Sequence, residues 1–110
     1  MASREAHEAF LKEIQRERGA SLARITQRLE RALSDLDEAS AALAAQPGDA
    51  KARALRAEAL AHAAELLWYV VVHREAMGLN RHDILDEVYR IPQEVHLAMG
   101  PRRGPAPPAR

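Results

Sequence analysis

Residues 63–79 read AAELLWYVVVHREAMGL and hold the only tryptophan of the chain and three consecutive valines. On a helical wheel that begins at Ala52, the apolar side chains of this segment spread over about 240°, whereas a surface helix needs an apolar face of little more than about 100°. A helix with so wide an apolar arc has to be covered from more than one side. The stretch therefore predicts an all-α protein in which other helices pack around this one.

A second long helix is predicted over residues 3–45, with Ser3 as its N-cap. Its leucines recur every seven residues, which is typical of a seam between two helices, at Leu22, Leu29, Leu36 and Leu43. The heptad phase breaks near Gly19, where we expect one continuous helix with a local irregularity. A first apolar face precedes the break, at Phe10, Leu11 and Ile14.

The sequence QPGD at residues 46–49 predicts a tight turn. Pro47 and Gly48 fit the centre of a type II turn, and Asp49 can cap a helix over 50–77 that ends at Gly78. Two long helices joined by so short a turn lie antiparallel.

Two short C-terminal helices are expected next. The first covers residues 81–90, with Asn80 and Asp83 as a capping pair and with Ile84, Leu85 and Val88 on one side. The second begins at Pro92, with Val95, Ala98 and Met99 pointing inward.

Residues 1–100 are predicted to form a single helical domain, and residues 101–110 a disordered tail rich in Pro and Arg. The chain has 23 alanines, which pack closely but bury little area each, so the core is thin for a monomer. We expect a homodimer to complete the helical bundle. The predicted core and interface residues are Leu22, Leu29, Leu36, Leu43, Leu66, Leu67, Trp68, Val70 and Val71.

Sixteen basic and sixteen acidic residues balance, so no overall field attracts nucleic acid or an anionic membrane. The chain has no cysteine, which excludes disulfides and thiolate chemistry. Residues 1–20 contain no apolar run of a signal peptide, and the run of large apolar residues over 66–72 is far shorter than the roughly 20 residues that span a bilayer. We expect a cytoplasmic protein with no membrane partner.

Four segments carry a resemblance to a known family: Glu65–Trp68, His73–Leu79, Tyr89–Val95 and Met99–Gly100. Together they resemble an uncharacterised family of small all-helical bacterial proteins, mainly over residues 60–100. The resemblance implies a helical fold. It implies no activity, cofactor or partner, because the family has none assigned.

A polar face on the second long helix is the one candidate metal site. His62, Glu65 and His73 lie close together on the wheel with Glu58 and Tyr69. Imidazoles and carboxylates can bind a metal, but the spacing matches no standard motif, including the Glu-x-x-His pair of di-iron bundles. The alternative, which we favour, is a solvent-exposed face without a metal. We also find no nucleophile beside a base and no Gly-rich phosphate loop, so neither an enzyme nor a cofactor is expected.

Residues 70–90 resemble a degenerate helix-turn-helix, which makes a small nucleic-acid-binding regulator the alternative function. Arg74 stands where that motif packs a small residue, and the would-be recognition helix is net acidic, which repels phosphate. Three further signals are weaker: a basic stripe on the first helix (Arg24, Gln27, Arg28 and Arg31), three tail arginines (Arg102, Arg103 and Arg110) and the Pro105-x-x-Pro108 pattern. A structural or protein-interaction role with an unknown partner is preferred.

Arg74 also lies inside the apolar arc of the second long helix. A buried guanidinium needs a partner. We expect either a buried ion pair with an acid from the C-terminal helices or a position at the rim with the head group in water. The acids in reach would be Asp83, Asp86, Glu87 and Glu94.

Overall fold

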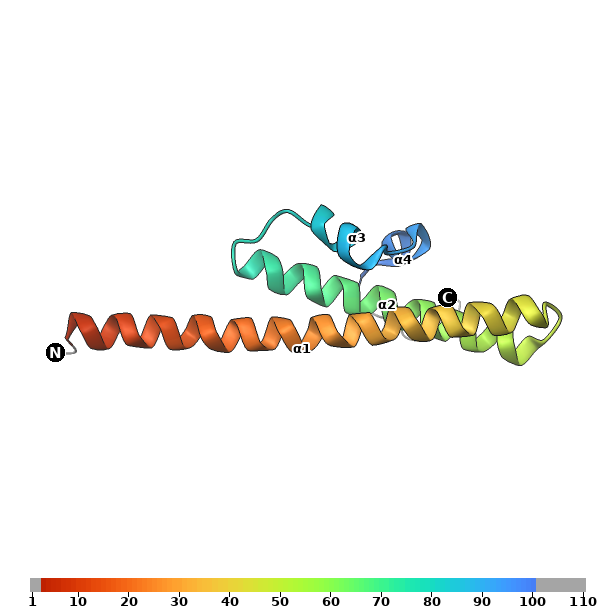
Figure 1. Cartoon of the computed structure of the whole chain (residues 1–110), viewed down its shortest axis with the longest axis horizontal. Coiled ribbons are helices and arrows are strands. Elements are labelled where there is room, and N and C mark those ends of the chain that lie inside the picture. The colour runs from red at the N-terminus through yellow and green to blue at the C-terminus, as the bar shows by residue number, and fades with distance from the viewer. Residues whose placement is uncertain (1–2, 101–110) are drawn as a thin grey trace, which may run out of the picture.

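The computed structural model describes residues 3–100, and in that range the chain forms four helices and no strand. They are α1 (Arg4–Ala45), α2 (Ala50–Ala76), α3 (Asp83–Tyr89) and α4 (Gln93–Ala98). Figure 1 shows α1 and α2 as an antiparallel hairpin, with α3 and α4 across α2 from α1. The predicted all-α fold, with two long antiparallel helices and two short ones, is confirmed. The predicted tail, with its arginines and its Pro-x-x-Pro pattern, lies outside the described residues.

The helix α1 runs without interruption through Gly19, as predicted. The Ser3 hydroxyl caps its start by accepting a hydrogen bond from the backbone N–H of Ala6 at 3.0 Å. A Cβ atom placed on Gly19 would meet nothing within 4 Å. Gly19 therefore makes no close helix contact.

The turn between the long helices has a different type from the predicted one. The backbone N–H of Asp49 donates to the carbonyl of Gln46 at 3.0 Å, and the Asp49 carboxylate caps α2 by accepting from the N–H of Lys51 at 3.0 Å. A type II turn requires a positive φ at its third residue. Gly48 does not adopt one, so the type II prediction was wrong, while the predicted cap at Asp49 is confirmed.

The end of α2 is a complete Schellman motif around Gly78, which has φ of 82°. The N–H of Gly78 donates to the carbonyl of Glu75 at 3.0 Å, and the N–H of Leu79 donates to the carbonyl of Arg74 at 2.8 Å. Gly78 is thus the residue that stops α2, as its sequence position indicated.

The core lies around α2, which contacts both α1 and α4. Leu29, Ala32 and Leu36 of α1 cover one side of α2, while Leu85, Ile91 and Val95 from the C-terminal segment complete the same cluster. This arrangement explains the wide apolar arc. The buried α2 residues of the cluster are Ala63, Ala64, Leu66, Leu67 and Val70.

Five of the nine predicted core residues are buried, namely Leu29, Leu36, Leu66, Leu67 and Val70. Leu22 and Val71 pack half-buried against the cluster. Leu43 and Trp68 are also half-buried and do not belong to it. The Trp68 ring lies against Tyr69, with ring centroids 5.1 Å apart. Trp68 is only half-buried because it stands at the edge of the apolar arc, between the covered and the open side of α2.

The two short helices are less buried than predicted. The helix α3 begins at Asp83 with His82 at its N-cap and without a side-chain cap, so the predicted capping pair of Asn80 and Asp83 was wrong. Each short helix places one residue in the core, Leu85 and Val95, because each is about two turns or less in length. Ala98 and Met99, which were predicted to point inward, are exposed, and so are Ile84 and Val88, which were predicted to share one side of α3 with Leu85.

Candidate interaction surfaces

The helix α1 is much longer than the helix that packs on it. It has 42 residues and α2 has 27, a difference of 15. Glu17, Arg18 and Ser21 line a hollow together with His73, Ala76 and Met77, so α2 ends beside residues 17–21. Residues 4–16, which we call the overhang, extend about 20 Å beyond this point, as the red part of α1 in Figure 1 shows.

The overhang carries large apolar side chains that are exposed or only half-buried in the described chain. Phe10 is 57% exposed and Leu11 is 48% exposed, while Ile14 is half-buried. Side chains like these are stabilised when a neighbour removes them from water. The overhang is therefore the first candidate interaction surface.

The apolar side of the overhang is in line with the side of α1 that faces α2. Leu11, Ile14, Arg18, Leu22 and Ile25 are spaced by three, four, four and three residues. On a straight helix this spacing keeps them within about 80° of one another. The row of apolar residues from Leu11 to Leu36, which we call the apolar stripe, thus continues past the end of α2, and Arg18 interrupts it where α2 stops.

The outer face of the C-terminal helices is a second exposed surface. Ile84 and Val88 lie one turn apart on α3, and Leu97 of α4 is 79% exposed. Acidic residues accompany them, since Asp83, Asp86 and Glu87 are exposed on α3. Exposed apolar residues that stand singly among charges are common on protein surfaces, so this face carries a weaker signal than the overhang.

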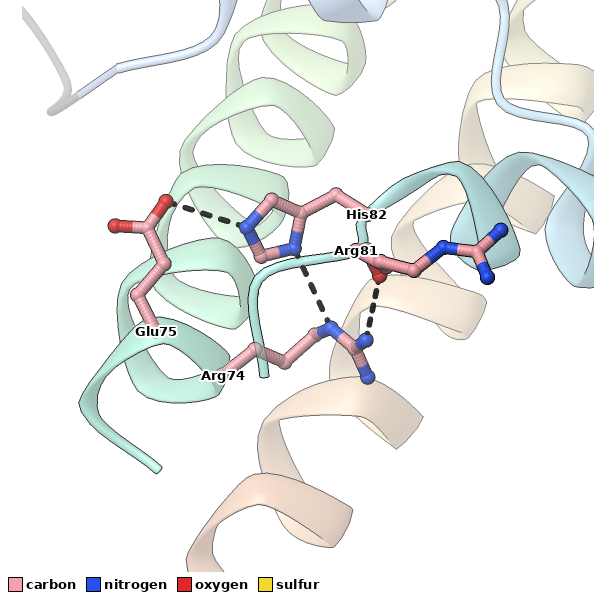
Figure 2. Close-up of polar contacts among 4 residues, drawn as sticks. All are labelled: Arg74, Glu75, Arg81 and His82. Carbon is pink, nitrogen blue, oxygen red and sulfur yellow. Dashed lines mark hydrogen bonds and ion pairs between the residues drawn. The ribbon is translucent and has the colours of Figure 1, made fainter. Parts of the chain in front are cut away.

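A polar joint holds the loop after α2 in place (Figure 2). The Arg74 guanidinium donates to the carbonyl oxygen of Arg81 at 2.7 Å and, through Nε, to Nδ1 of His82 at 3.4 Å. His82 in turn places Nε2 3.2 Å from Oε1 of Glu75. The joint ties residues 81–82 to the last turn of α2.

Arg74 therefore has partners other than those predicted from the sequence. Its side chain is half-buried, and within residues 3–100 it forms a hydrogen-bonded joint instead of a buried ion pair with an acid of the C-terminal helices. The reason is the path of the loop. Residues 77–82 fold back over the end of α2. The Arg74 guanidinium is therefore hydrogen-bonded to the backbone carbonyl of Arg81 and not to a carboxylate of α3.

Arg56 is a three-helix link that the sequence analysis missed. Its guanidinium donates to Oγ of Ser40 in α1 at 3.0 Å and pairs with the carboxylate of Glu94 in α4. Arg56 stands 18 residues before Arg74, which is five full helical turns, so both arginines occupy the same angle on the wheel. Arg56 thus lies inside the apolar arc as Arg74 does, and this position already predicts a partner for its guanidinium.

Two further pairs involve residues of the short helices. Nε2 of His96 lies 2.6 Å from Oδ1 of Asp86, which joins α4 to α3. Arg81 donates to Oδ2 of Asp83 at 2.8 Å. This hydrogen bond lowers the pKa of the Asp83 carboxyl below its ordinary value and raises the pKa of Arg81. Both partners are exposed, so the pair contributes little to stability.

The candidate metal ligands do not converge. Within residues 3–100, no group of three His, Cys, Asp or Glu side chains lies close enough to hold a metal ion, and this includes His62, Glu65 and His73. The His73 ring instead places Nδ1 2.9 Å from the backbone carbonyl of Tyr69, one turn earlier in α2. The polar face of α2 thus has the local hydrogen bonding of an ordinary helix surface.

The helix-turn-helix resemblance is not matched by the geometry. Six residues, 77–82, separate α2 from α3, whereas the two helices of that motif are joined by a turn of about three or four residues. The helix α3 has only seven residues and carries exposed acids. The basic side chains Arg24, Arg28 and Arg31 are exposed on α1 with the acidic Glu30 between them.

No protein-family model, curated protein or solved structure matches this chain. The resemblance to a family of small bacterial proteins therefore stays a prediction. Within residues 3–100, none of the helices combines the length and the apolar character that crossing a membrane requires.

Proposed function

We propose that this protein is a non-enzymatic interaction protein that acts as a homodimeric helical bundle. The observation that carries the proposal is the overhang, where Phe10 is 57% and Leu11 is 48% exposed, whereas Leu29 and Leu36 further along the same helix are buried. A single projecting helix draws most of its stability from packing. Association gives the overhang the packing that the chain itself does not supply.

Folding and association use separate parts of the chain in this proposal. The core cluster draws on all four helices and is closed within one copy. The overhang contributes no residue to that cluster. A copy can therefore fold first and associate afterwards. A cytoplasmic location and a further protein partner for the outer face of α3 and α4 belong to the same proposal.

The mass of the chain in solution tests the homodimer. Light scattering at micromolar concentration should report about twice the chain mass of 12.2 kDa. The species should dissociate on dilution, because a contact of a few helical turns buries little surface. A chain that keeps the monomer mass of 12.2 kDa at every accessible concentration would contradict the proposal.

A further inference from the structure

We propose that two copies of the chain pair through their overhangs in antiparallel orientation, so that each overhang continues the line of the partner's α2. This inference rests on the proposed homodimer and adds where the two copies meet and in which direction. It commits the overhang to a second copy of this chain. Four features support it: the apolar stripe, the direction of α2, the length of the overhang and the charges at its ends.

The antiparallel orientation of the second overhang follows from the position of the apolar stripe. Along residues 22–36 the stripe is covered by α2, which runs antiparallel to α1 and ends beside Arg18. An overhang from a second copy, placed antiparallel on Leu11 and Ile14, runs in the same direction as α2. It also begins where α2 ends. One side of α1 is then covered along nearly its whole length, first by α2 and then by the partner.

The length of the overhang is compatible with a symmetric arrangement. When the N-terminal end of one overhang reaches the end of the partner's α2, the partner's overhang reaches the end of α2 in the first copy. The two-fold axis then passes near Leu11, which places the exposed apolar side chains of both copies together at the centre. Such a contact is isologous and closes as a dimer instead of growing into a filament.

The helix dipoles at the junction favour the same orientation, and Arg4, which faces Arg18 there, is paired with Glu8 of its own helix at 3.6 Å. The C-terminal end of α2 carries a partial negative charge, and the N-terminal end of a helix carries a partial positive charge. The antiparallel arrangement places these opposite ends next to each other, at the hollow of about 310 Å³ that Glu17 and Arg18 help to line. A parallel arrangement would instead bring two positive helix N-termini together.

The overhang itself does not oppose pairing with a copy of itself. It contains three basic residues and three acidic ones, so two overhangs carry no net charge against each other. The contact is nevertheless small. Stable interfaces bury about 1,200–2,000 Å², and a contact confined to about four helical turns falls at or below the lower end of that range. The dimer is therefore reversible.

Cysteine cross-linking tests the orientation directly, because the chain has no cysteine of its own. Arg4 and Arg18 lie on the stripe side of α1, near the two ends of the proposed contact. In the antiparallel dimer, Arg4 of one copy faces Arg18 of the other, whereas the two Arg4 positions are about 21 Å apart along the helices. Neither residue belongs to the core cluster, so R4C and R18C keep the fold.

We expect a mixture of R4C and R18C to form several-fold more disulfide-linked dimer on mild oxidation than either variant alone. A9C, which lies about 160° from Leu11 around α1, is the control and should not cross-link above background with either variant. Cross-linking of R4C with itself would overturn the antiparallel orientation. If the chain is dimeric by light scattering but the mixture does not cross-link, the overhang is not the contact, and the homodimer stands without it. A monomeric mass overturns the homodimer itself.

Discussion

The two parts of α1 carry the same apolar pattern in different surroundings. Along residues 22–36 the stripe faces α2, and Leu29 and Leu36 are no more than 1% exposed. Along the overhang the stripe faces no other helix, and Leu11 is 48% exposed. Identical residue types therefore do different things on one helix. Those beside α2 stabilise the fold, and those beyond its end are available to a partner.

The largest expected effect separates these two roles. Leu29→Ala should lower the free energy of unfolding by about 2–5 kcal/mol, because it leaves a cavity in a fully covered site. That is a large share of the roughly 5–15 kcal/mol that a domain has in total. Leu11→Ala should change the stability of the dilute monomer far less. Urea unfolding of both variants measures the difference, and equal losses would show that the overhang is part of the folded core.

Trp68 should give a smaller effect than a fully buried residue. Because the ring is half-buried at the edge of the arc, Trp68→Ala should cost about 1–3 kcal/mol, less than the roughly 3–5 kcal/mol of a fully buried ring. As the only tryptophan it is also a clean fluorescence probe. Its emission should be partly accessible to iodide and should not change on dilution, because Trp68 lies on α2 and away from the overhang. A shift in emission on dilution would place the dimer contact on α2.

Gly19 gives the smallest expected effect, at the boundary between the two parts of α1. Gly19→Ala should raise the melting temperature, with a gain of about 0.5–1 kcal/mol, since alanine is the better helix former and the added Cβ meets nothing within 4 Å. Calorimetry of the dilute chain measures it. A loss of stability would mean that α1 bends at Gly19 or packs closely there.

Much of the fold could be predicted from the sequence because it follows from local patterns. The 240° arc on α2 required cover from two sides, and α1 and α4 provide it. The caps at Ser3, Asp49 and Gly78 depend on neighbouring residues only, and all three were correct. The continuity of α1 through Gly19 was also correctly predicted. Arg18, which interrupts the apolar stripe, lies where α2 ends beside α1, and only the pairing of the two helices determines this position.

Besides the local errors at the 46–49 turn and at the start of α3, the wrong or missed predictions concern contacts between elements. Arg56 and Arg74 occupy the same angle on α2, yet one pairs with Glu94 of α4 and the other with the backbone of the loop. The difference depends on the path of residues 77–82, which the local sequence does not fix. The same path moved the start of α3 from the predicted residue 81 to Asp83. The overhang was also missed as a surface, although the unequal lengths of the two predicted helices already implied it.

The most direct test of the overhang as the association surface is sedimentation of Leu11→Glu beside Ala9→Glu. Both changes put a carboxylate in place of an exposed apolar residue in the overhang, but they lie about 160° apart around α1. We predict that Leu11→Glu is monomeric at concentrations where the unchanged chain and Ala9→Glu are dimeric, and that all three unfold at similar temperatures when dilute. A Leu11→Glu chain that dimerises as tightly as the unchanged protein would contradict the account.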